Sequence, residues 1–402
     1  MRQKKKPKKN QAALYKEELK NLQTCKPLCQ HFRQCGGCDL QHYSYENQVN
    51  AKLNVFKSMV DNSYAKRAFK GVEITSLSSH RQSRYRQKMD FVCAFGKSGL
   101  RGNSFDDVVE LNDCHLVETD SFSVYKEAVK AAKEAELDFY DYIKHQGYLR
   151  YITIRRTRTG QQLLSFLTSS IEHGEKIEAI AKQFLDSEKI DSFVWQMTGG
   201  KTDTSFGSPY KVWGKDLLEE KMLEHRFKLT TNTFFQANQE VAEEAYRQIR
   251  EYARSFEPET LLDLYSGTCT IGITMSSVAK RIIAVENFLP NRDMALKNFE
   301  LNNISNIEYI DNDVADYMES CEESPEFVVC NPPRTGVDER PLRALVKLKP
   351  KGISYLSCNP KTLLDDLAVM SLNYKIENAT VLDMFPQTKH FETLIQLRRK
   401  DV

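Results

Sequence analysis

Apolar runs of strand length alternate with amphipathic stretches of helix length from about Phe227 to the end of the chain. An amphipathic stretch at 238–256 comes first, and apolar runs then follow at 260–267, 281–287, 307–313, 327–333 and 352–358. Strands that alternate with helices predict a doubly wound α/β sheet. Because ligands bind beyond the carboxyl ends of the strands in such a sheet, the residues after each apolar run are candidates for a site.

The chain before this region has a different pattern. Between 72 and 226, short alternating stretches surround a helical stretch at 123–143, which predicts an α+β domain with antiparallel strands. A helix is expected at 45–60, within a cysteine-rich region at 25–71. The lysine-rich, polar residues 1–24 are typical of a solvated flexible tail, and an arm that contacts RNA weakly is the alternative. The predicted divisions are therefore a basic tail at 1–24, a cysteine-rich region at 25–71, a middle domain at 72–226 and a C-terminal domain at 227–402.

Composition and charge narrow the class of protein. A chain of 402 residues is too long for one compact core, and its formal net charge of +2 hides two basic stretches, at 1–11 and 150–160. The opening run lacks the apolar core of a secretory signal, and no apolar run reaches the roughly eighteen residues that cross a membrane. We expect a cytoplasmic protein without a membrane partner. Its ten cysteines favour metal binding or catalysis over a disulfide framework.

Three of the predicted strands lead to side chains suited to a cofactor. The first contains Asp263 and runs into a turn with Gly267 and Gly272, where small residues let a ligand approach the backbone. Glu286 ends the second strand and can bind two ribose hydroxyls, and Asp313 ends the third and can accept from an adenine amino group. The turn can equally be an ordinary strand–helix connection, and Asp313 a helix cap. The glycine spacing differs from a dinucleotide motif, and a looser turn suffices for S-adenosylmethionine.

Two further strand ends carry groups suited to catalysis. Asn331-Pro-Pro is expected to form a stiff loop, similar to the Asn-Pro-Pro-aromatic motif of amino-group methyltransferases, but Arg334 stands at the aromatic position. Cys358 ends the next strand, and Glu392 precedes the last one. A cysteine thiolate that adds to carbon 6 of uracil makes carbon 5 nucleophilic, and a base must later remove the proton on carbon 5. Taken alone, Cys358 can also be a core cysteine and Glu392 a surface residue.

Together, five motifs resemble those of the S-adenosylmethionine-dependent RNA (uracil-5-)-methyltransferase family of bacterial ribosomal and transfer RNAs. They are FFQAN, LDLYSG, NPPRTG, YLSCNP and MFPQTKHFE, in the family's order, and the resemblance extends from about Cys29 to the C-terminus. It implies a doubly wound Rossmann-like methyltransferase domain, an α+β middle domain and a small iron–sulfur region, with Cys358 as nucleophile and Glu392 as general base. The cofactor contacts that it implies come from Gln236, Tyr265, Thr270, Glu286, Asp313 and Asn331.

The resemblance also bears on the early cysteines. Members of the ribosomal branch carry a [4Fe-4S] cluster, and its ligand positions match Cys29, Cys35, Cys38 and Cys114, with Cys25 outside the pattern. Four thiolates suit an iron–sulfur cluster, but a four-cysteine zinc site uses the same ligands. The spacing alone leaves both metals open, and the resemblance favours the cluster.

The activity that the resemblance implies is methylation of carbon 5 of a uridine in a structured RNA, with 23S ribosomal RNA as the expected substrate and a monomer as the expected state. The alternatives are the T-loop uridine of transfer RNA and a non-catalytic, metal-containing RNA-binding protein. The residues before Cys25 are too few for the small RNA-binding barrel that some members carry, so RNA is expected to contact the cluster region, the middle domain and the lysine-rich tail. Candidate phosphate contacts are Arg84, Arg86, Lys88, Arg155, Arg156 and Arg158.

Overall fold

The computed structural model describes residues 10–401 and divides them into two compact units. Of these residues, the first unit combines 10–25 with 43–80 and 240–401, and the second comprises 26–42 and 81–239. Each unit is therefore assembled from segments that are distant in sequence. The predicted division into four consecutive parts stays a prediction.

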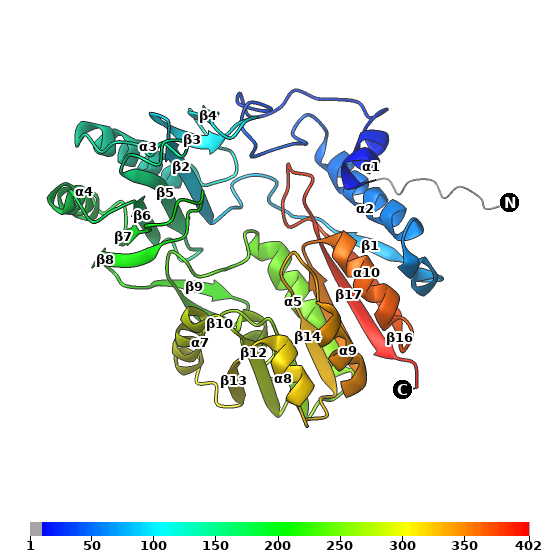
Figure 1. Ribbon diagram of the computed structural model, residues 1–402. Coiled ribbons are helices and arrows are strands. Elements are labelled where there is room, and N and C mark those ends of the chain that lie inside the picture. Colours follow the sequence, from blue (N-terminus) through cyan, green and yellow to red (C-terminus); the bar gives the residue numbers. More distant parts are fainter. Residues whose placement is uncertain (1–9, 402) are drawn as a thin grey trace. The chain divides into compact units, whose positions relative to one another are not determined.

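The first unit is built on an eight-stranded sheet in the order β1-β16-β17-β15-β14-β11-β12-β13 (Figure 1). Only β17 runs antiparallel to its neighbours, β15 and β16. The strands are β1 (Ile74–Leu77), β11 (Thr260–Leu264), β12 (Arg281–Glu286), β13 (Ile307–Asp311), β14 (Phe327–Cys330), β15 (Gly352–Ser357), β16 (Tyr374–Leu382) and β17 (Glu392–Arg399). The predicted α/β fold is confirmed, and the strand order reverses between β11 and β14, where ligands bind in such sheets.

Helices flank this sheet on both sides (Figure 1). They are α5 (Gln239–Arg254), α6 (Thr270–Thr274), α7 (Leu289–Leu301), α8 (Val314–Ser320), α9 (Glu339–Leu348) and α10 (Pro360–Met370). Every residue of β14 and β15 is buried, as expected for strands covered on both faces. The sequence pattern missed α8, a helix of only seven residues.

Two helices from the beginning of the chain belong to the same unit. The predicted helix at 45–60 is confirmed as α2 (Tyr45–Asp61), which Ser44 caps. Residues 1–9 of the predicted tail lie outside the described residues. The prediction of a flexible tail is wrong for α1 (Gln11–Glu18), because Asn10 caps this helix and its Leu14 and Tyr15 are buried.

Residues 64–77 also join the first unit. A 3₁₀ helix, η1 (Tyr64–Phe69), precedes β1, and β1 pairs in parallel with β16, so that Ile74 lies opposite Ala379. The sequence placed the residues of β1 in the middle domain. Four residues are too few for their periodicity to show which sheet they join.

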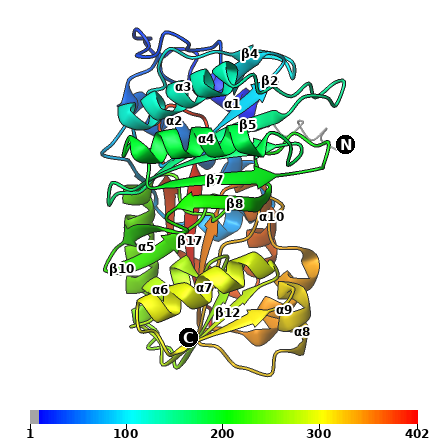
Figure 2. The same cartoon turned by 90° about the vertical axis from the view of Figure 1, so that its left-hand side faces the viewer.

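The second unit contains a seven-stranded sheet in the order β4-β3-β2-β5-β6-β7-β8 and a hairpin of β9 and β10. The helices α3 (Thr119–Glu134) and α4 (Gly174–Asp186) pack on the larger sheet (Figure 2). All its pairs are antiparallel except β6 with β7. The strands are β2 (Lys88–Ala94), β3 (Lys97–Arg101), β4 (Val108–Val109), β5 (Leu149–Arg156), β6 (Gln162–Thr168), β7 (Ser192–Met197), β8 (Ser208–Gly214), β9 (Leu218–Met222) and β10 (His225–Leu229).

Candidate functional site

The pairing of β15 with β17 brings Cys358 next to Glu392. Ser357, the last residue of β15, lies opposite Thr393, so the next pair in this antiparallel register is Cys358 and Glu392. Opposite residues in antiparallel strands have Cα atoms about 4.5–5.5 Å apart. Because strand β17 returns between β15 and β16, two residues that are distant in sequence meet at one edge of the sheet.

The surroundings of these two side chains perturb both of them. Glu392 is only 5% exposed, and this burial raises the pKa of its carboxyl group to about 7. Cys358 is half-buried, and burial followed by the negative charge of Glu392 raises the pKa of its thiol. Arg334 opposes this shift in pKa, because its guanidinium lies close enough to hydrogen-bond the sulfur. The site thus combines a thiol, a cation that favours the thiolate, and a carboxyl group that can exchange a proton near neutral pH.

Helix α10 holds the loop that carries Arg334. The side chain of Asn359, which caps α10, donates from Nδ2 to the Arg334 carbonyl at 2.8 Å. Further along the loop, the Val337 amide donates to Asp366 Oδ2 at 3.0 Å. Gly336 has a φ of +83°, and a Cβ there would lie 2.7 Å from Thr362 Cβ. The sequence predicted a stiff loop but missed the contact of Arg334 with Cys358, and the only signal was an arginine at a position where an aromatic residue was expected.

The turn after β11 is held to the neighbouring strand end. Asp263 is buried, which raises the pKa of its carboxyl group to about 7, and its Oδ2 accepts a hydrogen bond from the Gly272 amide at 2.8 Å. A Cβ on Gly272 would lie 2.9 Å from that oxygen, so a glycine is required here. Glu286 Oε2 accepts from the Gly267 amide at 3.0 Å, and Tyr309 donates to the Gly267 carbonyl at 2.8 Å.

Five of the six predicted cofactor-contacting residues lie at the carboxyl ends of four adjacent strands. Asp313 caps α8, because its Oδ1 accepts from the amides of Ala315 and Asp316 at 2.8 and 3.3 Å. The other four in this group are Tyr265 after β11, Thr270 at the start of α6, Glu286 at the end of β12 and Asn331 after β14. Gln236 belongs to the second unit, where it is buried after β10.

Fixed acceptors at this edge suit S-adenosylmethionine. Besides the Gly267 amide, the carboxylate of Glu286 accepts from the amides of Asn287 and Phe288 through Oε1, at 3.1 and 3.0 Å. Oε1 already accepts two hydrogen bonds, whereas Oε2 accepts one and has a further lone pair for a ribose hydroxyl. Asp263 Oδ1 is buried and has no hydrogen-bond partner among residues 10–401, so it is a second available acceptor.

The four predicted cluster ligands lie near one another in the second unit. Burial and then the negative charge of Cys114 raise the pKa of Cys38 to about 12, and burial raises that of Cys114 to about 11, with further contributions from Cys35 and Cys29. Gln41 donates to the Cys38 sulfur at 3.3 Å. Among the described residues, however, no three His, Cys, Asp or Glu side chains are grouped closely enough to hold a metal ion.

Several of the predicted phosphate contacts are structural instead. Arg84 pairs with Asp113 at 2.8 Å and donates to the carbonyls of Cys114 and Val117 at 2.9 and 2.8 Å. Arg155 is only 4% exposed and donates to the Thr233 carbonyl at 2.5 Å. Burial also lowers the pKa of Lys88, which pairs with Asp90 at 3.3 Å. The alternating pattern did not show that Arg155 is buried or that Arg84 and Lys88 pair with carboxylates of the protein itself.

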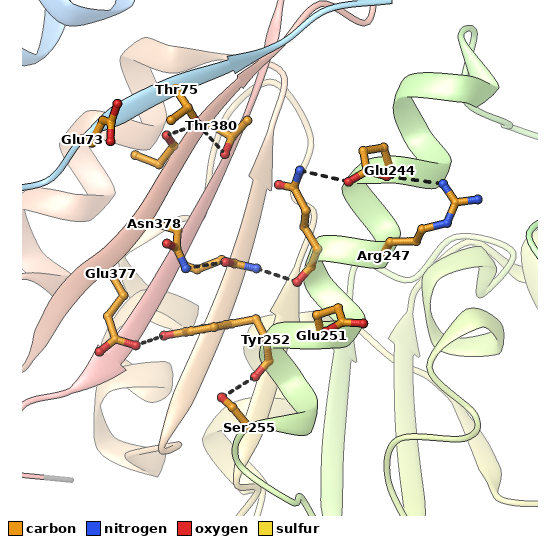
Figure 3. A pocket seen from close by; sticks show the side chains of 13 residues that line it. Glu73, Thr75, Glu244, Arg247, Glu251, Tyr252, Ser255, Glu377, Asn378 and Thr380 are labelled. Carbon is orange, nitrogen blue, oxygen red and sulfur yellow. Dashed lines mark hydrogen bonds and ion pairs between the residues drawn. The ribbon is translucent and has the colours of Figure 1, made fainter.

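A groove of about 900 Å³ lies in the first unit between α5 and the sheet (Figure 3). One of its carboxylates is engaged within the protein, since Glu377 accepts from Tyr252 at 3.0 Å and from Arg398 at 2.9 Å. None of the predicted site residues lines it. The lining residues are Glu73, Thr75, Glu244, Arg247, Gln248, Glu251, Tyr252, Ser255, Glu377, Asn378, Ala379, Thr380 and Gln396. In the described part of the chain, no helix is both long and apolar enough to span a membrane.

The strand order and the residues at the strand ends define a methyltransferase fold of the kind that uses S-adenosylmethionine. The family of tRNA (uracil-5-)-methyltransferases matches residues 210–400. An uncharacterized RNA methyltransferase of Caldanaerobacter subterraneus subsp. tengcongensis is 32% identical, covering 90% of this chain and 83% of that protein. Another, of Clostridium acetobutylicum, is also 32% identical, with coverages of 96% and 87%. The chain therefore belongs to the RNA (uracil-5-)-methyltransferase family.

A solved structure supports the same assignment. The crystal structure of Pyrococcus abyssi tRNA (uracil-54, C5)-methyltransferase, in complex with S-adenosyl-L-homocysteine, is similar with a TM-score of 0.75 at 26% identity. The similarity covers 90% of this chain and 86% of that chain. It therefore includes both units and not only the sheet of the first.

Replacing Glu392 with glutamine is expected to change how stability depends on pH. In the folded protein the pKa of Glu392 is about 7, above the value of about 4.3 for an exposed glutamate, so ionisation of this group opposes folding. The free energy of unfolding of the wild-type protein is therefore expected to fall as the pH rises from about 4 to about 7. Because glutamine does not ionise, the free energy of unfolding of Glu392→Gln should rise relative to that of wild type by about 2–3 kcal/mol over that range. Thermal unfolding at both ends of the range checks this. The exposed Glu300→Gln is the control, and a constant difference for Glu392→Gln would contradict the shifted pKa.

Removing the charge of Arg334 is expected to slow alkylation of Cys358. Arg334→Met should raise the pKa of the thiol further and reduce its reaction with iodoacetamide at about pH 8 by roughly 3- to 10-fold. Mass spectrometry of the peptide that contains Cys358 measures the rate. Arg343→Met, whose exposed guanidinium pairs with Glu339, is the matched control. Equal rates in both variants would show that Arg334 has no influence on the thiol.

Proposed function

We propose that this enzyme methylates carbon 5 of a uridine in 23S ribosomal RNA, with Cys358 as the nucleophile and Glu392 as the general base. The observation that supports the mechanism most directly is the register of β15 and β17, which pairs a strand-end thiol with a buried carboxyl group. A pKa of about 7 leaves this carboxyl group partly ionised at neutral pH, as a general base requires.

The proposed reaction begins and ends with the sulfur of Cys358. Its thiolate, favoured by Arg334, adds to carbon 6 of the uracil, and the electron pair of the 5,6 double bond moves toward the oxygen on carbon 4. S-adenosylmethionine, when bound, supplies the methyl group that carbon 5 takes up. The carboxylate of Glu392 then removes the proton from carbon 5, the double bond forms again, and the thiolate leaves.

The cofactor would be held at the carboxyl edge of the first unit's sheet. The proposed contacts of Glu286 are two ribose hydroxyls, and that of Asp313 is the adenine amino group. Both capping bonds to Asp313 use Oδ1, so an adenine contact through Oδ2 is compatible with the cap. The full set of proposed contacts is Gln236, Tyr265, Thr270, Glu286, Asp313 and Asn331.

We also propose that Cys29, Cys35, Cys38 and Cys114 hold a [4Fe-4S] cluster. Their mutual electrostatic interaction and their burial support this, because buried thiols with raised pKa values ionise when a metal supplies positive charge. The finding that no group is arranged for a single metal ion is compatible with a cubane. Its four irons take one thiolate each and keep the sulfurs farther apart than a zinc ion does.

The choice of 23S ribosomal RNA rests on the cysteine pattern, and transfer RNA is the second candidate substrate. The similarity to a tRNA (uracil-54, C5)-methyltransferase of Pyrococcus abyssi favours that second candidate. The proposed chemistry is the same for either RNA, since both require a uridine turned out of its stack. We propose that the enzyme acts on its RNA as a monomer in the cytoplasm.

Glu392→Gln is expected to trap the RNA substrate on the protein, because the proton on carbon 5 cannot leave and the bond from Cys358 to carbon 6 persists. The variant, expressed in cells and purified under denaturing conditions, should carry covalently bound RNA whose sequence identifies the substrate. A 23S fragment is the expected result, and transfer RNA would favour the second candidate. Cys358→Ala is the control and should carry none. The absence of trapped RNA from Glu392→Gln would contradict the role of Glu392.

Protein purified without oxygen is expected to contain about four irons per chain and to be coloured. Cys38→Ser should lose most of this iron, because a cubane requires all four thiolates. Cys25→Ser, which changes a cysteine outside the proposed ligand set, is the matched control and should keep it. Metal analysis by mass spectrometry measures both, and one zinc in place of the iron would overturn the proposed cluster.

A further inference from the structure

Three residues of α2 form a buried stripe on one side of the helix. Gln48, Lys52 and Phe56 are spaced by four residues, which places them on the same face, and each is at most 1% exposed. An amide and an ammonium group in such a position need partners, because a buried polar group without one destabilises the fold. Their partners lie in the loop 383–391, which connects β16 to β17 within the same unit.

The stripe contacts this loop at its beginning, middle and end. Lys52 Nζ lies 2.5 Å from Asp383 Oδ1 and donates to the Phe385 carbonyl at 3.0 Å. The side chain of Gln48 donates to Gln387 Oε1 at 2.9 Å and accepts from the Gln387 amide at 3.0 Å. Helix α2 itself packs on β1 and β16, and Figure 1 shows it beside β1.

The contact at the end of the loop, between Phe56 and Phe391, is adjacent to the proposed base. Phe56 packs edge-on against Phe391, with ring centroids 6.2 Å apart, and Phe391 directly precedes Glu392. Gln387 has a φ of +73°, a left-handed conformation that is rare for a residue other than glycine and that the two bonds to Gln48 help hold. The geometry of the loop therefore depends on α2 as well as on its own residues.

We propose that Gln48 and Lys52 are positioning residues that hold Glu392 opposite Cys358. This inference rests on the proposed function of Glu392. A shift of one residue at the start of β17 would turn Glu392 to the other face of the sheet, and smaller movements would take its carboxylate out of reach of the proton on carbon 5. The hydrogen bonds described above join Gln48 and Lys52 to the loop 383–391, so the inference assigns them an effect on Glu392 and not on the addition by Cys358.

The inference predicts a defect in one step only. In Gln48→Leu, the covalent complex with RNA should form at a rate close to that of wild type, but its decay should slow by at least about tenfold, because the base is misplaced. Rapid quenching and denaturing gels measure both rates in a single turnover. Asn50→Leu, on the exposed side of the same helix, is the matched control. A merely structural role would slow formation and decay together or change neither.

A second pair of variants tests the same inference independently, so that misfolding of one variant does not leave it undecided. Lys52→Met removes the ammonium group, and Lys57→Met makes the same change at an exposed position of α2. Lys52→Met should reproduce the slow decay seen in Gln48→Leu. If Lys52→Met fails to fold, Gln48→Leu decides the outcome alone, because its side chain is neutral and its loss leaves no buried charge.

Amide hydrogen exchange separates this inference from the mechanism on which it rests. Peptides that cover residues 383–392 should exchange faster in Gln48→Leu than in Asn50→Leu or wild type, whatever reaction the enzyme performs. Unchanged exchange would overturn the positioning role even if Glu392→Gln traps RNA. Faster exchange without trapping by Glu392→Gln would instead show that the proposed mechanism fails, and the role in positioning a base would fail with it.

Discussion

The hydrogen-bonded register between β15 and β17 is the constraint on which the proposed catalytic pair depends. In this sheet β17 alone runs antiparallel, and it enters between β15 and β16 so that its first residue faces the end of β15. The cooperative ladder holds Cys358 and Glu392 at the spacing of a cross-strand pair without any direct bond between them. A site built on two central strands is more rigid than one built on loops, and rigid placement is what proton transfer at carbon 5 would require.

Around this pair, opposing influences set the pKa of the Cys358 thiol. Burial and the carboxylate of Glu392 raise the pKa of Cys358, whereas the guanidinium of Arg334 lowers it. The balance depends on the loop after β14, which Asn359 and Asp366 tie to α10. Because the cap of the same helix, Asn359, directly follows Cys358, one element orients both the sulfur and the cation beside it.

Charged groups hold loops in both units. Lys52 and Asp383 form a buried ion pair with almost no exposure, whereas the partly exposed Arg84 joins Asp113 to the carbonyls of Cys114 and Val117. Replacing a buried pair with apolar residues often costs little, but removing one partner is strongly destabilising, by roughly 3–5 kcal/mol. Such pairs therefore specify where a loop lies more than they add to stability. In this protein one of these loops leads directly to Glu392 in the first unit, and the other carries Cys114 in the second.

The sequence by itself determined the α/β class, the positions of most strands along the chain and the residues that follow them. It could do so because alternating apolar and polar periods are local and because each strand end is marked by Gly, Pro or Asn. It also identified α2 from its helical spacing. Tertiary structure alone decided that β1 joins the sheet of the first unit, that residues 11–18 form a helix, and that Arg84 and Arg155 bond to the protein's own backbone. It also decided which loop α2 contacts through Gln48 and Lys52. These outcomes depend on partners that are tens to hundreds of residues away or on which side of a strand is covered, and a local pattern carries no information about either.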